Sequence, residues 1–177
     1  MTPQHSSGSA AVQAFCDLDW AMIGAVANPA TSSSGSKSTS DAIVFIASIG
    51  LSIPVEVKGG TSGISQVRPL AFTTLVIERP DVWYVFSAST VLVLAASYSG
   101  QHSKNPLAAF NPGVPPKYWS SFKHGNHEVP FAVLAAHSQA QSSPLKATAH
   151  QISREIELLH KLHRLEVVAL SRAKGVA

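Results

Sequence analysis

The residues best suited to chemistry are an acid and a base two positions apart, Glu56 and Lys58, and a second acid, Asp41, that precedes them. Because side chains alternate along an extended chain, Glu56 and Lys58 project from one face of a strand whose other face carries Val55 and Val57. The carboxylate and the ammonium group are therefore expected to stand side by side above a buried surface.

Two carboxylates that converge on one point repel each other, and a hard divalent cation between them stabilises the arrangement. Mg²⁺ fits because it takes oxygen ligands, keeps several waters and leaves positions open for phosphate oxygens; we expect Mn²⁺ to substitute for it. Such a metal polarises a phosphate and lowers the pKa of a bound water. Asp41 and Glu56 would hold the metal, and Lys58 would orient the water or neutralise charge on the phosphorus.

Two predicted strands bring these residues together. Asp41 opens the segment DAIVFIAS, and LSIPVEVK follows after Ile49 and Gly50, which predicts adjacent strands joined by a tight connection. A hairpin of this kind places Asp41 near the end of the second strand, where Glu56 sits. Before it, the alanine-rich residues 9–28 predict a helix, and the serine-rich residues 29–40 predict a loop.

The segments after the motif predict further helices and strands. Residues 61–78 predict a helix that Arg79 and Pro80 end, and the segments VWYVFSA and TVLVLAAS at 82–97 predict two strands. Residues 99–130 are rich in proline and predict an irregular surface excursion. FAVLAAHS fits a short strand or a helix, and the last thirty residues predict an amphipathic helix that is long enough to form a dimer seam.

Length and composition indicate one domain over residues 1–177, with 45% hydrophobic residues, 13% charged residues and a net charge of +3. A weak positive balance permits a polyanionic partner without requiring one. The single cysteine, Cys16, excludes a disulfide framework or a thiolate zinc site within one chain. With no leader pattern and no apolar run long enough to span a bilayer, we expect a soluble cytoplasmic protein with no membrane partner.

Asp41 at a strand start, Glu56-Val57-Lys58 on the next strand and two glycines after it resemble the PD-(D/E)XK nuclease superfamily, which includes type II restriction endonucleases and archaeal Holliday-junction resolvases. The resemblance covers about residues 9–98. It implies an α/β, restriction-endonuclease-like fold with a mixed central β-sheet flanked by helices, and Mg²⁺-dependent hydrolysis of phosphodiesters. It also implies that Asp41 and Glu56 bind the metal and that Lys58 is the catalytic lysine.

The chain departs from the superfamily pattern at two places. Ser40, rather than proline, precedes Asp41. The predicted N-terminal helix carries Asp17 and Asp19 where members often have a glutamate, so it stays open whether either aspartate joins the metal site.

Further residues are assigned to catalysis and to DNA binding. Gln66 resembles a polar residue that some members direct toward the site, so it joins the catalytic set. Arg68 lies where it would reach a phosphate. In the excursion, lysine, histidine and aromatic residues together suit an arm that tracks a phosphate backbone and touches base edges, and the residues assigned to DNA there are His102, Lys104, Lys117 and Lys123, beside Tyr118 and Trp119.

These observations predict a Mg²⁺-dependent DNA endonuclease, in its most specific form a type II restriction endonuclease. Cutting both strands at a palindrome requires two equivalent sites, so a homodimer is expected. A Holliday-junction resolvase or a homing endonuclease would use the same site chemistry. An alternative from another class is a non-catalytic nucleic-acid-binding domain in which Glu56 and Lys58 only form a surface ion pair.

Overall fold

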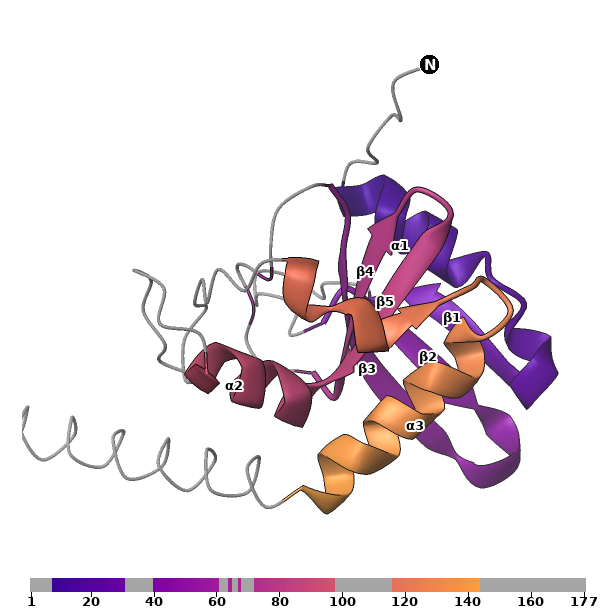
Figure 1. Ribbon diagram of the computed structural model, residues 1–177. Coiled ribbons are helices and arrows are strands. Elements are labelled where there is room, and N and C mark those ends of the chain that lie inside the picture. The colour runs from indigo at the N-terminus through magenta and orange to yellow at the C-terminus, as the bar shows by residue number, and fades with distance from the viewer. Residues whose placement is uncertain are drawn as a thin grey trace, which may run out of the picture.

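The computed structural model of the chain describes residues 8–30, 40–60, 64, 67, 72–97 and 116–143. These residues form an α/β fold in which six strands make one mixed sheet, with helices packed around it (Figure 1). The prediction of an α/β fold with a mixed central sheet and flanking helices is therefore confirmed. Within the described ranges, no helix is long and apolar enough to cross a membrane.

The strands follow one another across the sheet in chain order. The first three form an antiparallel meander, the fourth runs parallel to the third, and the last two are antiparallel to their neighbours. The strands are β1 (Ala25–Pro29), β2 (Ala42–Ile46), β3 (Leu51–Lys58), β4 (Thr74–Arg79), β5 (Val82–Ser87) and β6 (Lys123–His124).

The predicted hairpin of DAIVFIAS and LSIPVEVK is confirmed as β2 and β3. A short 3₁₀ turn, η2 (Ala47–Ile49), joins them, and it ends at Gly50, whose φ of 62° is in the left-handed region that glycine adopts without a steric penalty. Along β3, Ile53, Val55 and Val57 are buried, whereas the residues between them are half-buried. The period of two seen in the sequence is therefore the period of burial.

The predicted helix at 61–78 is wrong from Thr74 onward, where the chain forms β4. This strand is buried on both faces, so its apolar run is continuous rather than alternating, and such a run does not distinguish a strand from a helix. Pro80 and Asp81 then form a two-residue turn into β5. Asp81 has a φ of 61°, and proline followed by a residue of positive φ suits a type II turn.

Two other predicted elements differ from the structure. The predicted helix at 9–28 stops early: α1 (Gly8–Cys16) is followed by the 3₁₀ turn η1 (Trp20–Ile23), and Gly24, with φ of 64°, then turns the chain into β1. The predicted strand TVLVLAAS is instead the helix α2 (Ala88–Ser97). Its first turn is stabilised because Ser87 Oγ accepts a hydrogen bond from the Thr90 N–H at 3.0 Å.

The described part of the proline-rich excursion consists of two 3₁₀ turns, η3 (Pro116–Tyr118) and η4 (Ser120–Phe122), which lead into β6. FAVLAAHS belongs to a helix, α3 (Val129–Ser142), whose first turn contains Pro130. Most of the serine-rich loop, residues 99–115 of the excursion and the predicted C-terminal helix lie outside the described residues.

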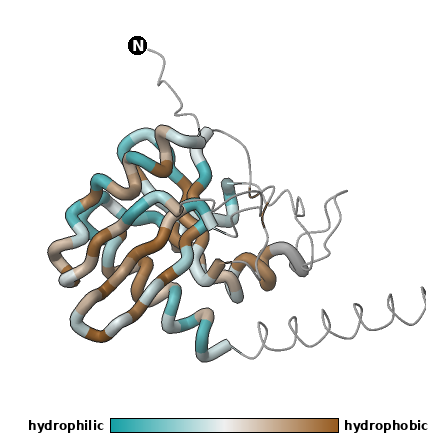
Figure 2. The backbone as a smooth tube through the Cα atoms, turned by 180° about the vertical axis from the view of Figure 1, so that it is seen from behind, coloured by the Kyte–Doolittle hydropathy of each residue, from teal (hydrophilic) through white to brown (hydrophobic). Residues whose placement is uncertain are grey.

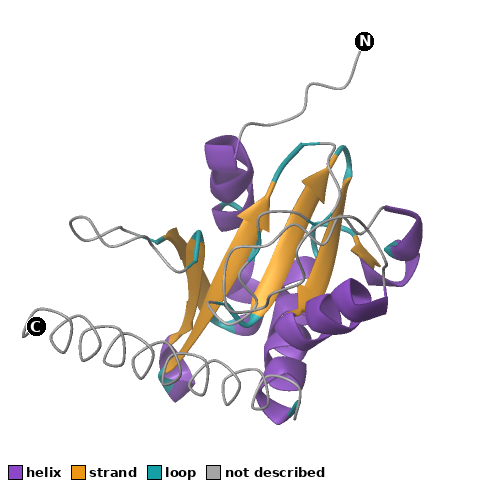
Figure 3. Ribbon diagram, turned by 90° about the vertical axis from the view of Figure 1, so that its left-hand side faces the viewer, coloured by secondary structure: helices purple, strands orange, loops and turns teal. Residues whose placement is uncertain are grey.

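The hydrophobic core has one part on each face of the sheet, and in Figure 2 the hydrophobic residues concentrate along the strands. On the first face, α1 and the start of α3 cover β2, β3 and β5, with Phe15 fully buried between Trp20 and Trp83. The second face is covered by residues from the β3–β4 crossover, from α2 and from the turn at Trp119. Figure 3 shows the strands side by side with the helices around them.

Candidate active site

Asp41 lies where β2 separates from β3. Regular pairing between the strands ends at Ala42 and Val55. The Asp41 N–H donates to the Val55 carbonyl at 3.0 Å, and the Val57 N–H donates to the Asp41 carboxylate oxygen Oδ2 at 2.9 Å. These two bonds reach the residues on either side of Glu56, so Asp41 lies beside the stretch of β3 that carries Glu56, as the hairpin predicted.

Glu56 and Lys58 lie on the face of β3 opposite Val55 and Val57. Lys58 Nζ is 2.5 Å from Glu56 Oε1, and the side chains are 30% and 13% exposed, respectively. In the parallel pairing with β4, Glu56 is level with Leu75 and Lys58 with Ile77, both of which are buried in the second core. The charged pair therefore borders an apolar layer, which reduces the screening of its charges by water.

A glycine and an arginine fix the chain just after the motif. Gly60 has a φ of 89°, which a residue with a side chain rarely adopts. Its carbonyl accepts a hydrogen bond from Arg79 Nη1, the same nitrogen that donates to the Glu78 carbonyl at 3.0 Å. The end of β3 is thus tied to the end of β4, its parallel neighbour.

Arg79 also contacts an aromatic residue of the excursion. Its guanidinium carbon lies 5.2 Å from the centre of the Trp119 ring, within the range of a cation–π contact. Burial lowers the pKa of Arg79 because it disfavours the charged form, and the neighbouring Tyr84 opposes that shift. Sequence reasoning missed this role. The sequence signal that could have shown it is the alternation of side chains along a strand. In β4 this alternation places Arg79 on the same face as Leu75 and Ile77.

The other predicted site residues fall into three groups. Lys117 and Lys123 are exposed on the turns and strand of the excursion. Asp17 and Asp19 follow α1, which packs on the first face of the sheet, opposite Glu56, and the Asp17 carboxylate accepts a hydrogen bond from Gln13 at 2.8 Å. The predicted residues outside the described part of the chain are Gln66, Arg68, His102 and Lys104.

The two carboxylates suit Mg²⁺, as a site with only two protein ligands. Within the described residues, no three histidine, cysteine, aspartate or glutamate side chains gather in one place. Mg²⁺ is commonly held by one or two carboxylates together with waters and substrate phosphates, so Asp41 and Glu56 are the described residues here that could hold it. The same contacts also serve a purely structural role, because Asp41 completes the strand end and Lys58 balances the charge of Glu56.

No family model matches this chain, and no curated protein or solved structure matches it significantly. The function of the chain is therefore inferred from its own residues and their contacts.

Proposed function

We propose that the chain is a Mg²⁺-dependent DNA endonuclease with a restriction-endonuclease-like fold. The observation that carries the proposal is the position of Asp41, which is bonded to both residues that flank Glu56, with Lys58 adjacent on the same face. In this proposal the carboxylates of Asp41 and Glu56 supply two oxygen ligands near the end of the hairpin, and Lys58 supplies the cation beside them. This is the set of groups that phosphodiester hydrolysis at a metal requires.

Each side chain has a distinct role in this reaction. Mg²⁺, when bound, supplies charge that activates water and polarises the phosphate. Asp41 contributes its carboxylate while Oδ2 keeps the bond to the Val57 N–H, which fixes the ligand in place. Asp41 and Glu56 would hold the ion, and Lys58, which is paired with Glu56, would hold the attacking water. The water oxygen forms the new bond to phosphorus as the bond to the leaving oxygen breaks.

The arrangement of the strands supports the same class of protein. After α1, an antiparallel meander ends in the motif strand β3, and β4 lies parallel next to it, so the motif strand is in the middle of a mixed sheet. A type II restriction endonuclease is the most specific form of the proposal, and it entails a homodimer because two sites are needed to cut a palindrome. A junction resolvase or a homing endonuclease would use the same residues.

The test is incubation of the purified chain with plasmid and phage DNA, in Mg²⁺ and in EDTA. The wild-type chain is compared with Glu56→Gln and with Glu78→Gln as a matched control, because Glu78 lies on the neighbouring strand and alternation directs it to the first face. We expect discrete Mg²⁺-dependent fragments from the wild-type and control chains and none from Glu56→Gln. Cleavage that survives in Glu56→Gln would remove Glu56 from the mechanism.

A second candidate function is a non-catalytic nucleic-acid-binding domain. The 2.5 Å ion pair between Glu56 and Lys58 favours it, because each charge already has a partner without a metal. Mg²⁺ titration calorimetry separates the two functions. A catalytic site loses Mg²⁺ affinity in Asp41→Asn, whereas a structural pair gives no Mg²⁺ binding in either chain. DNA that is bound but left intact, as duplex and as four-way junction, would favour this second function.

A further inference from the structure

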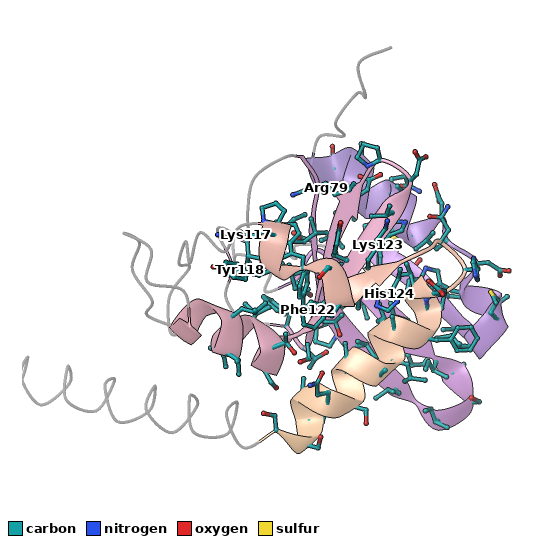
Figure 4. All side chains as sticks on the ribbon, in the orientation of Figure 1. Arg79, Lys117, Tyr118, Phe122, Lys123 and His124 are labelled. Atoms are coloured by element: carbon teal, nitrogen blue, oxygen red, sulfur yellow. The ribbon has the colours of Figure 1, made fainter. Side chains whose placement is uncertain are left out.

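The turns and strand at residues 116–124, which we name the flank segment, divide into an inner and an outer set of side chains (Figure 4). Trp119 is fully buried and Phe122 is partly buried, and both pack on Phe86 of β5 with ring centres 5.8 and 4.8 Å away. Trp119 also meets Tyr84 edge to face at 5.4 Å. The inner residues anchor the segment, so Trp119 is not placed to read bases.

The outer set carries positive charge on an exposed surface. Lys117 and Lys123 are both exposed, and the Lys117 ammonium lies 5.1 Å from the centre of the Tyr118 ring, which is 47% exposed. The segment contains no acidic residue. An anion that approaches the flank segment therefore meets two lysines on a backbone that packing has already fixed, so little conformational entropy is lost on binding.

The register of the sheet relates the flank segment to the candidate active site. Lys58 is level with Ile77, Ile77 with Tyr84, and Tyr84 with Lys123. All four belong to one row across β3, β4, β5 and β6, and level residues of paired strands share a face of the sheet. His124, one position later, is level with Trp83 and belongs to the first face. Lys58 and Lys123 are three strand spacings apart, roughly 14 Å.

We infer that the flank segment binds the phosphate backbone of duplex DNA beside the scissile phosphate, with Lys117 and Lys123 as the contacting residues. This inference rests on the proposed endonuclease function, because it assumes that the phosphate to be cleaved lies next to Lys58. At about 3.4 Å of helix axis per nucleotide, a span of roughly 14 Å corresponds to about four base pairs. Arg79, bonded to Gly60 and stacked on Trp119, keeps the segment at a fixed distance from the motif strand.

The first measurement is the affinity for a random-sequence 30-base-pair duplex in EDTA, which prevents cleavage, over a range of salt concentrations. In the double variant Lys117→Ala/Lys123→Ala we expect several-fold weaker binding. The slope of log K against log salt should fall by about 1.8, since each phosphate contact contributes about 0.9. Lys117→Arg/Lys123→Arg, which keeps the charge, should bind as the wild type does.

A control separates a local contact from the change in net charge. Ala10→Glu/Ala21→Glu lowers the net charge by the same amount at exposed positions of α1 and η1, which pack on the first face. This variant should keep the wild-type affinity and salt slope. If it weakens binding as much as the lysine double variant does, the effect comes from net charge and the assignment of the flank segment is wrong.

The second measurement places the contact along the DNA. Once the cleavage site is known, single methylphosphonates, which remove one phosphate charge, are introduced at successive positions. We expect binding to weaken about four base pairs from the cut and the double variant to be insensitive there. If the double variant binds and cuts DNA as the wild-type chain does, the inference about the flank segment is wrong, and the proposed function still stands. A wild-type chain that neither binds nor cuts DNA would overturn the proposed function as well.

Discussion

The two faces of β3 are made by the same eight residues and differ in almost every property. On the first face Ile53, Val55 and Val57 are at most 3% exposed and pack under α1. On the second face Glu56 and Lys58 are partly exposed and form an ion pair. A slip of one residue in register would exchange the two sets, so burial of the first face fixes the position of the second. The fold thereby sets the position of the residues of the proposed site.

The largest expected effect on stability comes from removing a buried side chain from the first face. Phe15→Ala removes a fully buried ring that contacts Trp20 and Trp83, and it should lower the free energy of unfolding by about 3–5 kcal/mol. Glu56→Gln on the second face weakens a partly buried charged contact but leaves the side chain in place, so it should lower it by less, about 1–3 kcal/mol. Urea denaturation followed by circular dichroism measures both. Equal destabilisation by the two substitutions would contradict the division between the faces.

The next effect separates the two roles of Asp41. Asp41→Ala leaves the Val57 N–H without its acceptor and should cost about 1–3 kcal/mol of stability. Asp41→Asn retains an oxygen acceptor and should preserve most of that stability, while Mg²⁺-dependent cleavage is lost in both variants. The measurements are urea denaturation and the plasmid assay. Full cleavage by Asp41→Asn would show that the residue serves the strand end only.

A smaller effect on stability is expected at Gly60, two residues after Lys58. Gly60→Ala introduces a side chain at a φ of 89°. Within the part of the chain that the structure describes, and apart from its chain neighbours, no atom lies within 4 Å of the added carbon, so backbone strain of about 1–2 kcal/mol is expected. Gly8→Ala is the matched control, because the same space is open there and φ is not positive. Thermal unfolding compares the two. A neutral Gly60→Ala would mean that the turn after Lys58 adapts to a side chain.

The smallest expected effect concerns the reactivity of Cys16, which packs at the edge of the first face. Burial, and then the negative charge of Asp17, raise the pKa of the Cys16 thiol. A raised pKa leaves less thiolate at pH 8, so alkylation by iodoacetamide should be slower than for free cysteine, with the rate still rising above pH 9. Asp17→Asn should increase the rate modestly. A rate–pH profile followed by mass spectrometry tests this, and a midpoint below that of free cysteine would contradict it.

The sequence predicted the face of β3 well because alternation is local. The hairpin of β2 and β3 and the proximity of Asp41 to Glu56 followed from it. β4 was mistaken for a helix because strands buried on both sides lose their alternation, and α2 was mistaken for a strand because the Ser87 cap was not recognised. The link from Arg79 to Gly60 and Trp119 depends on three segments meeting in space, which no local pattern encodes.

The bond between the Val57 N–H and the Asp41 carboxylate makes one backbone amide a spectroscopic reporter of the candidate site. Amide chemical shifts respond strongly to the charge of the acceptor, and this acceptor is a carboxylate assigned to the metal. The Val57 resonance should therefore move on titration with Mg²⁺, whereas that of Val44, buried inside β2, stays in place. Occupancy of the site would then be followed in solution without DNA and without turnover.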